Sequence, residues 1–199
     1  MTQNKNIKDF WDWFREIAAL LSRDVENPLL LQEVDARVHR LDSTLSWEIG
    51  PGSHEPWQFV ISPNLDRQLR TKAQEIVSQA PVMHGWEFHS ARRPKEWDYK
   101  LLMERSEGQP PLRLDTSGWG FVVLRYPDGS QEILLQANDL PALSDDERWQ
   151  AAAITLESIL GEDVLLDKVS EFELVEQLES RFAEKRKPIQ DLRAVLLTI

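Results

Sequence analysis

Hydrophobic residues recur at helical spacing through the first forty residues. Between residues 7 and 22 they fall every three or four positions, which predicts an amphipathic helix with one apolar stripe. That stripe consists of Phe10, Trp13, Phe14, Ile17, Leu20 and Leu21. Asn27 followed by Pro28 is typical of an N-cap and a first helical residue, and a second apolar stripe runs to about Leu41. The two segments predict an α-hairpin.

The period of the pattern then changes to two. Apolar and polar residues alternate over 45–49 and 57–61, and the turn-rich residues 51–56 between them predict a hairpin with a longer loop. Helical spacing returns over residues 64–80 and stops at Pro81. Residues 86–90 predict another strand, whereas residues 92–111 carry no regular pattern beyond a short apolar run at 99–103.

The C-terminal half begins with the clearest hairpin, in which residues 119–126 and 132–136 flank the turn at 127–130. Ser144 followed by Glu147 is a capping box, and the helix it starts is expected to bury Trp149 and to end at Gly161. Residues 163–175 predict strand, residues 176–187 a charged helix broken by Pro188, and the last residues a short helix or strand.

The order of these elements indicates the fold class. Hairpins dominate and strict alternation of strand and helix is absent, so we expect an α+β fold with a mostly antiparallel sheet. The N-terminal α-hairpin and the further helices would pack on that sheet. No repeat or low-complexity linker divides the chain, and its 199 residues suit one core, so residues 1–199 are predicted to form a single domain.

Charge is the first feature that narrows the function. The net charge is −11, and residues 128–179 contain fourteen acidic residues against Arg148 and Lys168. Such a region repels a phosphate backbone and an anionic lipid surface, so we expect neither nucleic acid nor membrane as partner. It is either a solvated surface or a docking face for a basic protein.

Composition excludes several kinds of chemistry. The chain has no Cys, which rules out thiol catalysis and Cys-ligated metal centres. It has neither a signal peptide nor an apolar run of about 20 residues, so a soluble cytoplasmic protein is expected. Phosphate-binding and serine-nucleophile motifs are absent. His84 and His89, even with Glu87, make a weak metal set, and we predict no catalytic residue, cofactor or metal.

Eight Trp residues are the one compositional oddity. Most occupy inward positions and suit a Trp-rich core. Trp11, Trp57 and Trp97 are the candidates for surface anchors, since Trp is enriched at interaction hot spots. Stacking on a sugar is a further use of the same side chain.

Three short landmarks together resemble a known type of protein. They are Phe10-Trp11-Asp12-Trp13-Phe14, Ser117-Gly118-Trp119 before a strand, and Leu156-Glu157-Ser158-Ile159-Leu160-Gly161-Glu162-Asp163 at a helix end. The set resembles bacterial cytoplasmic domain families of unassigned function, some of which are similar in layout to small immunity proteins of toxin systems. The resemblance implies a bacterial, cytoplasmic protein and carries over no catalytic residue.

The sequence therefore favours a non-enzymatic interaction protein, with an immunity-like role as its concrete form. The expected partner-binding residues are Asp145, Asp146, Glu162, Asp163, Glu171 and Glu173, with a Trp as apolar anchor. One alternative is a hydrolase or sugar-acting enzyme built from dispersed carboxylates and Trp, for which Glu171 and Glu173 on one strand face are a candidate pair. The other is a self-associating structural protein. The oligomeric state stays open.

Overall fold

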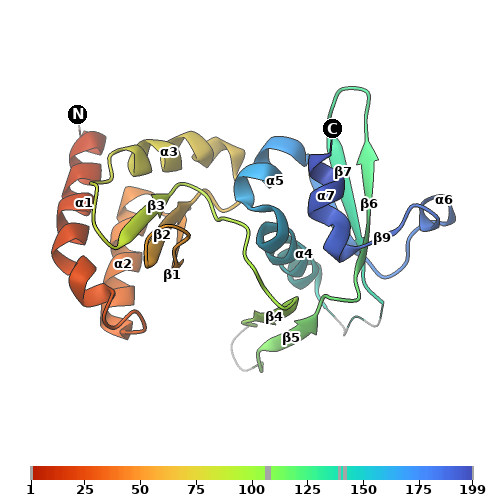
Figure 1. Cartoon of the computed structure of the whole chain (residues 1–199), viewed down its shortest axis with the longest axis horizontal. Helices are drawn as coiled ribbons and strands as arrows, with labels where there is room; N and C mark the ends of the chain where they lie inside the picture. Colours follow the sequence, from red (N-terminus) through yellow and green to blue (C-terminus); the bar gives the residue numbers. More distant parts are fainter. Residues whose placement is uncertain (1, 106–108, 139, 141–142, 199) are drawn as a thin grey trace. The chain divides into compact units, whose positions relative to one another are not determined.

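The computed structural model of the chain describes residues 2–105, 109–138, 140 and 143–198, with side chains from residue 5 onward. It contains two compact units, Met1–Arg92 and Arg93–Ile199. Both units combine helices with strands, so the predicted α+β class is confirmed (Figure 1). That the whole chain behaves as one domain stays a prediction.

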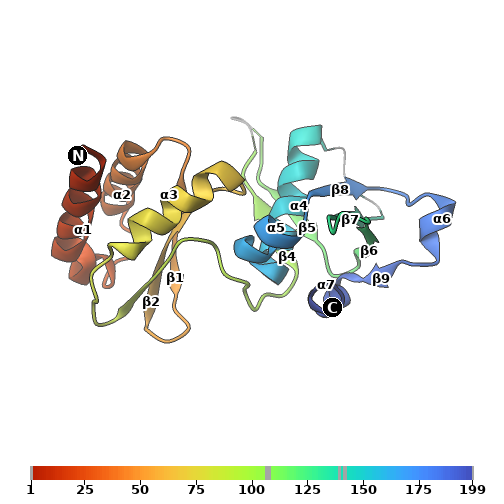
Figure 2. The same cartoon turned by 90° about the horizontal axis from the view of Figure 1, so that it is seen from above.

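The first unit is an α-hairpin, a strand hairpin and a crossover helix. Its elements are α1 (Thr2–Leu21), α2 (Pro28–Leu41), β1 (Ser46–Pro51), β2 (Trp57–Ser62), α3 (Arg67–Ser78) and β3 (Trp86–His89). Helices α1 and α2 lie side by side in Figures 1 and 2, as the α-hairpin prediction required. The sheet has the order β1-β2-β3. Strand β1 pairs antiparallel with β2, whereas β2 and β3 run parallel because α3 carries the chain back between them.

Local capping decides where these helices begin. The Asn27 side chain accepts hydrogen bonds from the backbone N–H groups of Leu29 and Leu30, which confirms the predicted start of α2. Helix α3 starts later than residue 64, because Asn64 and Leu65 have positive φ angles of 56° and 61°. Asp66 caps the helix instead, by accepting from the N–H of Gln68.

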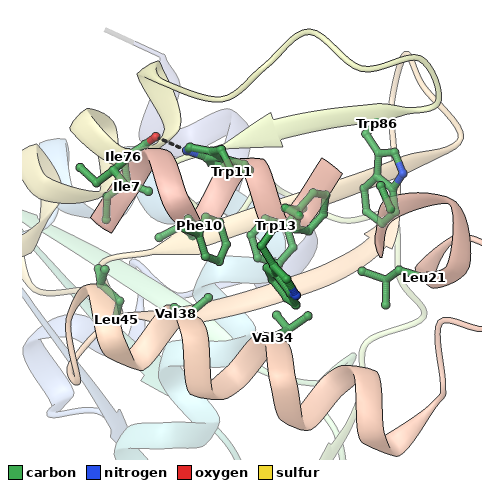
Figure 3. Close-up of a cluster of buried hydrophobic side chains, with 14 of the residues drawn as sticks. Ile7, Phe10, Trp11, Trp13, Leu21, Val34, Val38, Leu45, Ile76 and Trp86 are labelled. Atoms are coloured by element: carbon green, nitrogen blue, oxygen red, sulfur yellow. Dashed lines mark hydrogen bonds between the residues drawn. The ribbon is translucent and has the colours of Figure 1, made fainter. Parts of the chain in front are cut away.

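An aromatic core holds the first unit together (Figure 3). Phe14 and Phe59 are fully buried, with ring centroids 4.8 Å apart. Trp11, one of the three candidates for a surface anchor, is 2% exposed, and its Nε1 donates to the Ile76 carbonyl oxygen at 2.8 Å. The surface prediction for Trp11 is therefore wrong: its position at the edge of the α1 stripe faces α3. The reverse error occurs at Leu20, which is exposed.

The second unit contains two sheets. Its elements are β4 (Lys100–Met103), β5 (Leu112–Asp115), β6 (Gly120–Arg125), β7 (Gln131–Gln136), α4 (Asp145–Leu160), α5 (Glu162–Lys168), β8 (Glu171–Val175), α6 (Ser180–Ala183), β9 (Lys187–Pro188), a 3-10 turn (Ile189–Asp191) and α7 (Leu192–Leu197). Strands β4 and β5 form an antiparallel pair, and the larger sheet has the order β8-β7-β6-β9. Among the described strands of this larger sheet, only β7 and β8 run parallel, with α4 and α5 as their crossover.

Two segments of the second unit differ from the sequence pattern. Residues 163–168 lie in α5 rather than in a strand, since Gly161, at φ 82°, ends one helix and the next starts at once. Residues 176–187 contain the one-turn helix α6 and the first residue of β9 instead of a long charged helix. Arg186 explains this difference in part: its guanidinium lies against Gly120 and donates to the Gln136 side chain, so the segment is held against the sheet.

The buried indole of Trp11 gives a stability prediction. Trp11→Phe removes the donor to the Ile76 carbonyl and leaves a cavity, so we expect a loss of about 1–3 kcal/mol in the free energy of unfolding, measured with urea. Trp149→Phe is the matched control, because Trp149 is 53% exposed and its replacement should cost less than about 0.5 kcal/mol. Equal losses in the two variants would contradict the assigned role of Trp11.

Candidate functional site

The candidate site lies where the first turns of α4 meet β8. Ser144 accepts from the N–H of Glu147, and the Glu147 carboxylate accepts from the N–H of Ser144, so the predicted capping box is present. Arg105 Nε also donates to this carboxylate, at 2.6 Å. The Arg105 hydrogen bond is the main reason that the pKa of Glu147 is lowered, with the Ser144 N–H second. These contacts fix the start of α4.

Strand β8 supplies the other wall of the site. Its parallel register places Phe172 opposite Ile133 and Leu174 opposite Leu135, and both β7 residues are fully buried. Phe172 and Leu174 therefore point to the sheet face that α4 covers, whereas Glu171 and Glu173 are exposed and share the alternate positions. The prediction that Glu171 and Glu173 share one face is confirmed. Since β8 is the edge of its sheet, this wall is open on one side.

A hollow of about 220 Å³ lies between these two elements. Its lining consists of Asp145, Arg148, Trp149, Ala152, Phe172, Glu173 and Leu174. Trp149 stacks on Phe172, with ring centroids 5.8 Å apart and planes inclined by 30°. Two acidic residues, Asp145 and Glu173, and the two rings belong to this lining, and we call this the α4–β8 hollow.

Arg148 is the one basic residue in this lining, and its charge is already engaged. Its Nη2 donates to Glu176 Oε1 at 2.7 Å. The charge of Arg148 is thus balanced by Glu176, which leaves the negative charges of Asp145 and Glu173 in the lining. The hollow therefore presents a net negative charge to an incoming group.

The structure brings together part of the predicted set. Asp145 and Glu173 line the hollow, Asp146 follows in the same exposed turn, and Glu171 is exposed on the same strand. Asp163 is exposed on α5 and does not line the hollow. Glu162 is fully buried, so the expectation of an exposed carboxylate there is wrong.

Two of the predicted Trp anchors are only partly exposed. Trp57 stacks on Trp86 in the first unit, with ring centroids 6.2 Å apart. Trp97 lies beside Tyr99, with centroids 5.3 Å apart. Neither lines the α4–β8 hollow.

Trp149 is the functional candidate that the sequence pattern missed. Its helical phase predicts burial, but its side chain is 53% exposed. Alanines occupy positions 151–153 and are buried, so α4 lies close to its neighbours there and the larger ring one turn earlier projects past that contact. The run of three alanines at 151–153, shortly after Trp149, is the sequence feature that could have indicated this exposure.

The histidine candidates do not assemble into a metal site. Glu87 Oε1 lies 3.2 Å from His89 Nε2, but the Glu87 carboxylate also accepts from the N–H groups of Ser53 and His54. Burial raises the pKa of Glu87, yet these hydrogen bonds and His89 outweigh it and lower that pKa to about 2. No group of three His, Asp or Glu side chains placed to hold a metal occurs in the described part of the chain.

The carboxyl groups with a lowered pKa are poor general acids. The side chains of Lys72 and Thr44 hold the pKa of Asp42 far below its usual range. The pKa values of Glu87 and Glu147 are lowered as well. A hydrolase that uses a pair of carboxyl groups at neutral pH needs one of them with a raised pKa, to act as general acid. These three carboxylates stay ionised instead and act as hydrogen-bond acceptors that order loops and a helix start.

Comparison with known proteins returns no relative. No family model, no curated protein and no solved structure matches the chain. Within the described residues, no helix is long and apolar enough to cross a membrane.

The lowered pKa of Glu147 predicts a pH dependence of stability. A carboxylate whose pKa is lower in the folded state than its ordinary 4.5 stabilises the fold above that pH and loses this effect as the pH falls through the folded value. Glu147→Gln should therefore lower the urea midpoint at pH 7, and the difference from wild type should shrink below about pH 4.5.

Asp146→Asn is the control, because it removes an exposed carboxylate from the same turn while the pair of Arg105 and Glu147 stays intact. Its effect should be the smaller of the two at pH 7. A Glu147→Gln deficit of equal size at pH 3 and pH 7 would show that the ion pair is not its cause.

Proposed function

We propose that this protein is a non-enzymatic interaction protein that binds a basic partner protein at the α4–β8 hollow. The observation that carries the proposal is the exposed Trp149 ring, stacked on Phe172 in a hollow whose lining includes the acidic residues Asp145 and Glu173. An immunity-like role, in which a basic protein is bound and neutralised, is the concrete form that the sequence resemblance favours.

The chemistry of the hollow suits a guanidinium or ammonium group of the partner. A cation above an aromatic face gains up to about 2 kcal/mol when it is desolvated. Asp145 and Glu173, the acidic residues of the same lining, would supply charge-assisted acceptors, and Arg side chains fit such acceptors in a bidentate way. Trp149 would thus act as the anchor, with the surrounding acids setting the choice of partner.

The wider charge pattern supports the same partner chemistry. Asp146 and Glu171 are exposed on the two elements that form the hollow, and residues 128–179 carry fourteen acidic residues against two basic ones. Such a field raises the rate of encounter with a basic protein and weakens at high salt. Apolar contact with Trp149 and Phe172 would supply the part of the affinity that salt does not screen.

Affinity capture from the native lysate tests the proposal. Wild type, the pair Asp145→Lys with Glu173→Lys, and the control pair Asp9→Lys with Glu16→Lys serve as baits at roughly 50 mM and 500 mM salt. Both pairs change the net charge equally, and Asp9 and Glu16 are exposed on α1. We expect wild type and the control pair to retain a basic protein at low salt, and the hollow pair to lose it.

Trp149→Ala separates the anchor from the charges. Removal of a hot-spot Trp costs about 2 kcal/mol or more, so the Kd for the captured protein should rise at least roughly thirtyfold. If the control pair weakened capture as much as the hollow pair, general charge and not this hollow would be responsible. Capture of a second copy of the chain would favour the self-association alternative.

A further inference from the structure

A second hollow lies in the same unit, on the segment that carries no regular sequence pattern. It measures about 330 Å³, near the lower limit for small-molecule sites. Its lining includes Lys95, Glu96, Trp97, Tyr99, Gln190 and Arg193. None of these residues lines the α4–β8 hollow, so the two sites are distinct and can be tested separately.

The backbone at this hollow is held in an unusual conformation. Tyr99 has a φ of 61°, which is costly for a bulky residue. Its carbonyl accepts two hydrogen bonds from Thr116, one from the N–H at 2.8 Å and one from Oγ1 at 3.1 Å. Thr116 therefore stabilises the strained residue, and the Tyr99 ring is kept beside Trp97, with centroids 5.3 Å apart.

Trp97, which lines this hollow, has an unused donor. Its Nε1 atom is buried and has no hydrogen-bond partner among the described residues. A buried N–H without an acceptor costs about 1–3 kcal/mol, and such groups in folded proteins call for an explanation such as a missing ligand or water. A ligand oxygen that reached Nε1 would recover that free energy.

The charges of the lining define the kind of ligand. Arg193 donates one N–H to the Ile159 carbonyl at 3.3 Å, and its guanidinium carries five N–H donors in all. Lys95 adds a second cation, whereas Glu96 adds one negative charge. The Glu96 carboxylate repels a doubly charged phosphate more strongly than it repels a ligand with a single negative charge. A ligand carboxylate also matches the planar guanidinium.

We propose that this hollow binds a small aromatic carboxylate. The ring of the ligand would lie against Trp97 and Tyr99, and its carboxylate would accept hydrogen bonds from Arg193 and from Trp97 Nε1. Gln190 is fixed beside this position, because its Nε2 donates to the Ser117 carbonyl at 2.8 Å. The site gives the chain a small-molecule ligand in addition to its proposed protein partner.

Titration followed by ¹⁵N NMR of the indole N–H groups tests this proposal. Benzoate is the probe, benzamide is its neutral counterpart of similar shape, and inorganic phosphate reports simple anion binding. Trp97→Phe assigns the Trp97 signal. We expect benzoate to shift that signal saturably and benzamide to bind at least about tenfold more weakly, because charge-assisted hydrogen bonds are roughly twice as strong as neutral ones.

Two exposed or partly exposed arginines provide matched variants. Arg193→Gln should weaken benzoate binding about tenfold, whereas Arg113→Gln, at an exposed position of β5 outside both hollows, should leave it unchanged. The proposal is overturned if benzoate causes no saturable shift, if benzamide or phosphate binds as well as benzoate, or if the two arginine variants behave alike.

Discussion

Helix α4 is buried along most of its length, and the second unit is arranged around it. Its buried residues run from Ala151 to Leu160, with Ile154 partly covered, and it contacts β4, β8, α5 and α7. Such a helix cannot shift along its axis without breaking contacts on several sides. The capping box and Arg105 fix its first turn as well. The exposed ring of Trp149 is thereby held in one place against Phe172.

This constraint connects the fold to the proposed function. A pre-organised aromatic ring in an acidic lining loses little side-chain entropy when a partner binds, so more of the contact energy appears as affinity. The acidic residues of α4 and β8 then select partners by charge, and the open edge of β8 leaves room for them. The second hollow depends on the same helix, because Lys95 N–H donates to the Ser158 carbonyl and Arg193 to that of Ile159.

Local signals in the sequence were sufficient for much of the fold. Asn27 with Pro28, and Ser144 with Glu147, act through neighbouring backbone groups, so the starts of α2 and α4 could be predicted. The β6–β7 hairpin was predicted for the same reason. Residues 163–168 were not, because a short apolar run does not distinguish strand from buried helix.

The candidate site was predicted in part. Charge density pointed to Asp145 and Glu173, which the hollow brings together. Periodicity placed Trp11 at the edge of the apolar stripe of its helix and Trp149 on the inward side of its own helix. The structure shows Trp11 buried and Trp149 exposed, because burial depends on which neighbour packs against each helix. For Trp11 the neighbour is α3, through Ile76. Glu162 failed similarly, since its burial follows from tertiary contacts rather than from its own polarity.

Mapping of a minimal ligand by NMR tests the central claim most directly. Titration with N-acetyl-arginine amide presents one guanidinium without a partner protein. Binding at the α4–β8 hollow predicts that the Trp149 indole N–H and the backbone amides of Phe172 and Glu173 shift most, and that Trp149→Ala abolishes the shifts of those amides. Shifts of similar size at exposed acids throughout both units, with no concentration at the hollow, would contradict the account.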